Sequence, residues 1–174
     1  MKRILAVLLS AVMALSLAAC GGSQQSGGEG AAASSGSELL FGVPADASSL
    51  DPQTQNDGYS EEITKMLYNT LFKFDENATP VPSLVESYEV SDDDLTWTFK
   101  LKEGVKFHNG KELTSADVVA SFNRAIPDDS GYIATSMIEP IESVEAVDTY
   151  TVAIKTFGPY GPMLSLLSNY NTAI

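Results

Sequence analysis

The clearest pattern of hydrophobic and polar positions lies between residues 95 and 102, where it repeats every second residue. Its apolar members are Leu95, Trp97, Phe99 and Leu101, and its polar members are Thr96, Thr98, Lys100 and Lys102. Strict alternation predicts a strand with one buried face, so Trp97 is expected to pack in the core. The run Asp92–Asp94 before it predicts a turn that pairs this strand with residues 87–90.

Other segments follow either a helical or a strand pattern. Ser60 opens a predicted helix whose apolar face is formed by Ile63, Met66, Leu67 and Leu71. Thr114 and Asp117 form a near capping box for a second helix, with Val118, Val119 and Phe122 as its apolar stripe. Residues 143–147 and 150–156 predict an antiparallel pair, and residues 39–43 predict a short first strand that ends at Pro44. The predicted fold class is therefore α/β, in a mixed α+β arrangement.

The N-terminus carries the signature of an exported protein. Residues 4–19 hold no charge, follow Lys2 and Arg3, and end in small residues. This is the pattern of a secretory signal, and it is too short for the ~20 apolar residues of a membrane span. The ending Leu17-Ala18-Ala19-Cys20 resembles the lipobox of bacterial lipoproteins. We expect a signal peptide over residues 1–19 and lipidation at Cys20; an ordinary signal peptide with an incidental cysteine is the alternative.

Composition extends this picture to the segment behind Cys20. Residues 21–37 contain Gly, Ser, Gln, Ala and one Glu, which predicts a flexible tether that spans residues 20–37 together with Cys20. Residues 38–174 would then form the folded body. Beyond the two basic residues of the signal, 8 basic residues stand against 23 acidic ones, a net charge of −15. Such a charge disfavours nucleic acid as a partner.

Candidate chemistry in the body is sparse. The sole histidine, His108, has no catalytic partner in its neighbourhood, and no nucleophile motif, phosphate loop or zinc motif occurs. With Cys20 lipidated no free thiol remains. The sequence therefore predicts no enzyme, no cofactor and no metal site. Tyr59, Tyr132 and Tyr160 lie in loops, where each could line a cleft or simply pack on its loop.

The order of the segments resembles a known family. The residues that carry the likeness are 49–52 (Ser-Leu-Asp-Pro), 57–60, 68–71, 81–101, 104–122 and 144–148. They are similar to the N-terminal third of the family 5 extracellular solute-binding proteins, the receptors of peptide and nickel ABC importers. The resemblance implies a partial periplasmic-binding-protein-like type II fold with an incomplete first lobe, and a body over residues 38–174 that is the N-terminal part of a longer domain.

The same resemblance implies a function and a set of site residues. A protein of this family captures a small solute, most often an oligopeptide or dipeptide, and delivers it to ABC permease subunits. The regions that face the cleft in related proteins correspond here to Tyr59 and Ser60, and to Tyr132 and Thr135. A lipid anchor would hold the protein at the extracytoplasmic face of the cell membrane. A secreted enzyme fragment, or a sensory or adhesive lipoprotein, remains the alternative.

Overall fold

A four-stranded antiparallel sheet is the centre of the structure, a computed structural model that describes residues 40–126 and 131–174. Its strands are β3 (Val85–Val90), β4 (Thr96–Leu101), β5 (Ile141–Asp148) and β6 (Thr151–Thr156), in the order β3-β4-β6-β5. The predicted pairing of residues 87–90 with the alternating strand is confirmed, and so is the hairpin of residues 143–156. The two hairpins join through β4 and β6.

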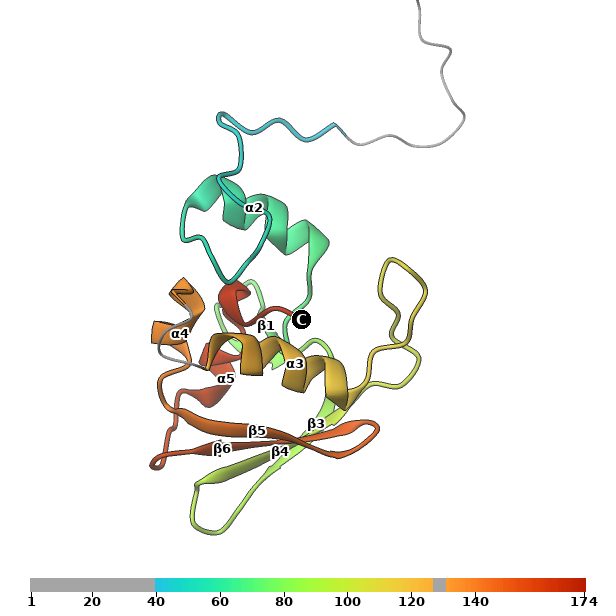
Figure 1. Cartoon of the computed structure of the whole chain (residues 1–174), viewed down its shortest axis with the longest axis vertical. Helices are drawn as coiled ribbons and strands as arrows, with labels where there is room; N and C mark the ends of the chain where they lie inside the picture. The colour runs from blue at the N-terminus through green and yellow to red at the C-terminus, as the bar shows by residue number, and fades with distance from the viewer. Residues whose placement is uncertain (1–39, 127–130) are drawn as a thin grey trace, which may run out of the picture. The chain divides into compact units, whose positions relative to one another are not determined.

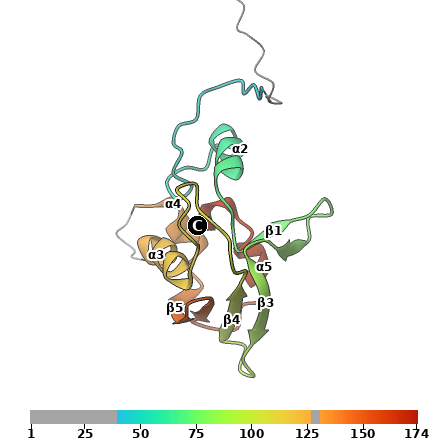
Figure 2. The ribbon, with the colours of Figure 1, turned by 90° about the vertical axis from the view of Figure 1, so that its right-hand side faces the viewer.

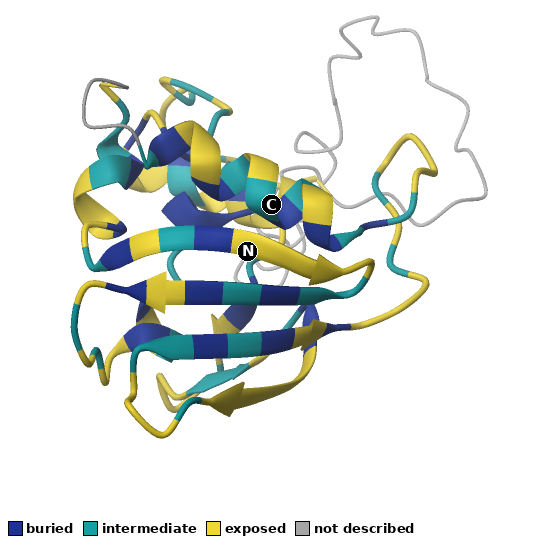
Figure 3. Cartoon of the chain, turned by 60° about the horizontal axis from the view of Figure 1, so that its bottom comes forward, coloured by how far each residue is buried: buried dark blue, intermediate teal, exposed yellow. Residues whose placement is uncertain are grey.

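The register of β4 and β6 places large apolar side chains on one face. Trp97 pairs with Ile154, and Phe99 pairs with Val152. Phe99, Val152 and Ile154 are fully buried, while Lys100 and Lys155 on the opposite face are exposed. Figure 3 shows buried positions alternating with intermediate or exposed ones along these strands. The predicted core position of Trp97 is confirmed.

Helix α3 (Ser115–Ala125) lies across the buried side of the sheet, next to β5 and β6 (Figure 1). Thr114 is its N-cap, and Asp117 completes the predicted capping box. The Asp117 carboxylate accepts a bond from the backbone N–H of Thr114 at 3.0 Å. Val118 and Phe122 are buried toward the sheet. The N-terminus of the helix is therefore capped, and its apolar side is packed in the core as far as Ala125 in the last turn.

A smaller sheet packs at the other end of the core. Strands β1 (Phe72–Phe74) and β2 (Pro80–Pro82) form it, and α5 (Met163–Leu166) lies close by, as Figure 2 shows. The Phe72 ring meets the Phe99 ring edge-on, with centroids 5.8 Å apart. The Phe72 N–H donates to the carbonyl of Leu167 at 3.2 Å. These contacts join the smaller sheet to the core of the larger one.

Three short elements complete the described chain: α2 (Gly58–Leu67), α4 (Ile133–Met137) and the 3₁₀ helix η2 (Tyr170–Thr172). The η2 helix contacts both α2 and α4. It brings the C-terminal residues beside the loop that precedes α2, and this arrangement matters for the site described below.

Two predicted features are wrong. Residues 40–43 form no strand, because no other strand of the described chain pairs with them; Leu39 lies outside the described residues. The predicted apolar face of α2 is not its buried face. Met66 is 57% exposed, whereas Ser60 and Thr64 are buried. The helix packs through its polar side because that side is bonded to the preceding loop.

Candidate functional site

The loop of residues 46–57 is fastened to the start of α2. Asp57 is the N-cap, and its carboxylate accepts the Ser60 N–H at 2.9 Å. The Ser48 hydroxyl donates to the other Asp57 oxygen at 2.5 Å, and the Ser48 N–H donates to the Ser60 hydroxyl oxygen at 2.8 Å. The bond from Ser48, followed by those from Ser60, lowers the pKa of Asp57 to about 2. The carboxylate is therefore ionised at neutral pH and closes the loop.

The middle of this loop is buried through side-chain amides. The Gln53 side-chain amide donates to the backbone carbonyl of Ser121 on α3 at 2.8 Å. The Gln53 backbone carbonyl accepts the N–H of Ala134 on α4 at 3.2 Å. From η2, the fully buried Asn171 amide donates to the carbonyls of Pro52 and, at 3.0 Å, Gln55. Three separate segments of the chain thus hold one loop.

A charged and aromatic assembly lies at the edge of the same loop. Arg124, in the last turn of α3, donates to both carboxylate oxygens of Asp51, one of them at 2.9 Å. The Arg124 guanidinium carbon also lies 4.4 Å from the centre of the Tyr132 ring. The hydrogen bond from Arg124 lowers the pKa of Asp51, and the bond to Asp51 raises the pKa of Arg124. Both groups are charged, and the ring covers the cation.

The four sequence-predicted ligand contacts lie on both sides of this loop. Tyr59 is 43% exposed in the first turn of α2, while Ser60 beside it is fully buried. Tyr132 is the N-cap of α4 and is half-buried; Thr135 follows in α4, and its hydroxyl donates to the carbonyl of Ala125 at 2.8 Å. The loop connects the two pairs, because it is bonded to Ser60 at one end and to Ala134 in its middle. Cys20, the predicted lipidation site, lies outside the described residues.

Within this set Tyr59 is exposed, Tyr132 and Thr135 are half-buried, and Ser60 is fully buried. The Ser60 hydroxyl is occupied by Ser48, and the Thr135 hydroxyl is bonded to α3. Their side chains support the loop and α4. Arg124, Asp51 and Asn171 were not predicted as parts of the site.

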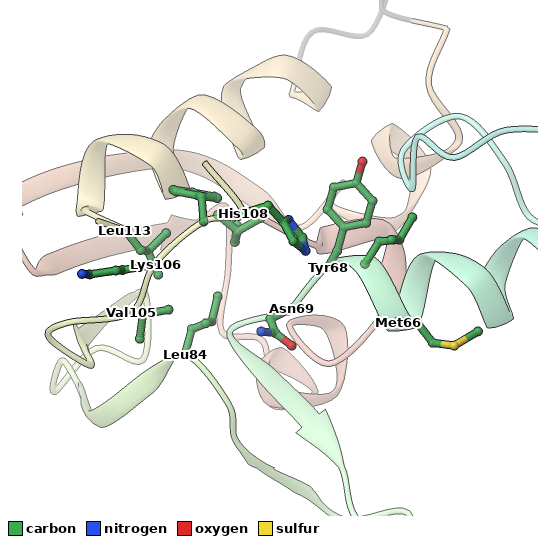
Figure 4. Close-up of a pocket in the computed structure, with 11 residues that line it drawn as sticks. Met66, Tyr68, Asn69, Leu84, Val105, Lys106, His108 and Leu113 are labelled. Carbon is green, nitrogen blue, oxygen red and sulfur yellow. The ribbon is translucent and has the colours of Figure 1, made fainter. Parts of the chain in front are cut away.

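A separate hollow of about 410 Å³ opens on another part of the same folded unit (Figure 4). One side of it is lined by Leu84, just before β3, and by Val105 and Leu113, between β4 and α3. The other side, at the end of α2, is lined by Met66, Tyr68 and Asn69. His108 lies at its rim beside Tyr68. This hollow contains none of the four predicted contacts. Its lining is mostly apolar, with Tyr68, Asn69, Lys106 and His108 as its polar members. We take the loop surface as the candidate site because the four predicted contacts lie there.

Within residues 40–126 and 131–174, no group of three or more His, Cys, Asp or Glu side chains could hold a metal ion. The same ranges contain no helix that is long and apolar enough to cross a membrane.

Solved structures of other proteins have a similar fold. A chain of DppA, an ABC transporter-associated periplasmic binding protein from Helicobacter pylori solved with the peptide STSA, superposes with a TM-score of 0.65 at 30% identity over 75% of this chain and 29% of its own. NikA from Brucella suis, solved with Fe(III)-EDTA, gives 0.68 at 31% identity over 75% and 26%. The chain has part of the fold of the periplasmic binding proteins of type II.

Sequence comparison gives the same assignment. The glutathione-binding protein GsiB of Escherichia coli O1:K1 / APEC is 34% identical over 137 residues, which cover 79% of this chain and 27% of the relative. This chain thus spans about a quarter of the length of the curated relatives it matches. These relatives are solute-binding proteins, not enzymes. The family model described as bacterial extracellular solute-binding proteins, family 5, middle, matches residues 79–174. The chain belongs to the bacterial extracellular solute-binding proteins of family 5.

Proposed function

We propose that this chain forms part of the solute-binding wall of a receptor for an ABC importer, and that the solute is a short peptide. The carrying observation is that two aromatic side chains, Tyr59 and Tyr132, lie at the margins of the loop of residues 46–57. The chain that carries them belongs to a family of solute-binding proteins. An aromatic ring with a polar tip offers apolar area and a hydrogen bond at a low entropy cost, which suits a peptide backbone.

Tyr59 and Tyr132 are the proposed contacts, and Ser60 and Thr135 are the proposed supports. DppA of Helicobacter pylori is described in complex with a peptide, and GsiB is described as binding glutathione, which is itself a peptide. These descriptions favour peptides over a bare metal ion.

The N-terminal segment completes the proposal. A signal peptide over residues 1–19, lipidation at Cys20 and a tether up to residue 37 would hold the binding body near the membrane, where permease subunits can accept the solute. Cys20 and the tether lie outside the described residues, and the sequence pattern supports them.

The test is an NMR titration of the isotope-labelled chain with trialanine and, separately, with glutathione. Because one wall leaves part of the solute in water, we expect weak binding, with a dissociation constant on the order of 1 mM. Signals of Tyr59, Tyr132 and their neighbours should move. Tyr59→Ala and Tyr132→Ala should each weaken the response, while His108→Ala, at the rim of the separate hollow, should leave it unchanged. Shifts confined to the residues around His108 would contradict the proposed site.

A further inference from the structure

The last turn of α3 carries a side chain that joins both parts of the candidate wall. Arg124 grips the loop through both oxygens of Asp51 and covers the ring of Tyr132, with 4.4 Å between its guanidinium carbon and the ring centre. We propose that Arg124 is a positioning residue, which fixes the Tyr132 ring against the loop so that the two predicted contact segments act as one wall. This inference rests on the proposed function for its effect on solute.

The base from which Arg124 reaches out is rigid. Helix α3 is capped by Thr114 and Asp117, and Phe122 and Ala125 are buried on either side of Arg124. The guanidinium therefore starts from a backbone that the core holds in place.

Both partners of Arg124 are also oriented by other bonds. Asp51 accepts the N–H of Gln53 at 3.1 Å, and its own N–H donates to the Ser49 hydroxyl at 3.0 Å. On the other side, Tyr132 directly precedes α4, which the Ala134 N–H ties to the Gln53 carbonyl. The Arg124 fork and this backbone bond are thus two parallel connections between the loop and the α4 segment.

The Arg124–Asp51 ion pair is partly exposed, so its effect on side-chain orientation can be distinguished from its effect on stability. The Arg124 and Asp51 side chains are 42% and 29% exposed. An ion pair this exposed adds little to global stability, because water screens it. A bidentate fork that also stacks on a ring nevertheless fixes direction, since the planar guanidinium can satisfy both partners in only one orientation. Lysine, a single flexible point charge, keeps the charge and loses that orientation.

The experiment compares Arg124→Lys with the wild-type chain in four measurements: thermal stability, the ring-proton shifts of Tyr132, hydrogen exchange at the Ala134 amide, and affinity for trialanine. We expect a nearly unchanged melting temperature, displaced Tyr132 ring signals, faster hydrogen exchange at the Ala134 amide, and affinity lowered about tenfold. Asp51→Asn should reproduce the displaced ring signals, because it releases the fork from the loop side. The control is Lys100→Met, which removes a more exposed ion pair, to Glu86 on the sheet (side chains 52% and 55% exposed), and should change none of these readouts.

The outcomes separate two claims, the positioning role of Arg124 and the proposed function. Tyr132 ring signals that stay unchanged in both Arg124→Lys and Asp51→Asn would overturn the positioning role, whatever happens to affinity. A fall in melting temperature that accounts for all other changes, seen in both variants, would also overturn it, because Arg124 would then act only in stability. If the wild-type chain fails to respond to trialanine and to glutathione, the proposed function falls, while the ring signals and amide exchange still decide the role of Arg124.

Discussion

Replacing Trp97 tests whether the packing of its ring or the burial of its indole N–H dominates its contribution to the free energy of unfolding. Trp97 is the single tryptophan and is 9% exposed. Its ring is stacked near Tyr88, with centroids 5.9 Å apart, and near Phe99 at 6.3 Å. The indole nitrogen Nε1 is buried and has no acceptor within the described part of the chain. Packing and hydrogen bonding therefore oppose each other at this residue.

The two terms can be compared for two substitutions. Trp97→Ala removes the whole ring and leaves a cavity, so it should cost about 3–5 kcal/mol of unfolding free energy. Trp97→Phe keeps a ring between its neighbours and loses roughly 1 kcal/mol of apolar burial. It also removes an unpaired N–H whose burial costs about 1–3 kcal/mol. The second term equals or exceeds the first, so Trp97→Phe should range from no net change to about 2 kcal/mol of stabilisation.

Urea unfolding followed by far-UV circular dichroism measures these changes, since the variants lack the tryptophan fluorescence. Phe99→Ala serves as the control, because Phe99 is fully buried and has no polar side-chain atom; it should also cost about 3–5 kcal/mol. If Trp97→Phe destabilises the chain as much as Trp97→Ala does, the reasoning about the unpaired N–H is refuted.

Three further changes test other parts of the structure. Cys20→Ala should move the protein from the membrane fraction to the soluble one, and a membrane-bound variant of uncleaved mass would contradict lipidation. Asn171→Leu strips the Pro52 and Gln55 carbonyls of their donor and should cost about 1–3 kcal/mol for each carbonyl in urea unfolding. Because the folded pKa of Asp57 is lowered to about 2 from 3.8, its contribution is present above the higher value and lost as pH falls toward 2. Protection of the Ser60 amide should fall in that window, and an NMR titration midpoint near 3.8 would contradict the cap.

Local patterns in the sequence predicted the two hairpins of the larger sheet and α3 correctly. The alternation around Trp97 and Phe99 depends only on neighbours within one strand. The capping box of Thr114 and Asp117 depends only on residues at the start of one helix. Each signal is complete within a few residues, and burial then follows from it. The pairing of β4 with β6 lay beyond such reasoning, since their residues are about 50 positions apart and no local signal marks the partner.

The α2 error shows where periodicity misleads. Helical spacing favoured Ile63, Met66 and Leu67 as the buried face, but Thr64 is buried instead and donates to the Ser60 carbonyl at 2.9 Å. Periodicity assumes that apolar side chains face the core of the described chain. Here the loop bonds draw the polar side inward, and Met66 and Leu67 line the hollow of Figure 4.

The candidate site was predicted only in part. Family resemblance pointed to the segments of Tyr59 and Tyr132, yet their connection depends on side chains that meet across the chain. Arg124 and Asp51 are separated by 73 positions, and Asn171 lies 119 positions from Pro52. A single sequence gives no pairing signal for such contacts, although the Leu-Asp-Pro run at residues 50–52 marked one end of each.

These long-range contacts set orientation because the core has already closed the chain. Loop-closure entropy grows only with the logarithm of separation, about 0.6 kcal/mol for each doubling, so 73 and 119 positions cost nearly the same. The sheet of β3 to β6 and the buried face of α3 meet that cost through apolar burial. Hydrogen bonds other than those of Arg124 hold the loop beside α3, α4 and η2. An exposed ion pair too weak to fold the chain can therefore decide which way the Tyr132 ring faces.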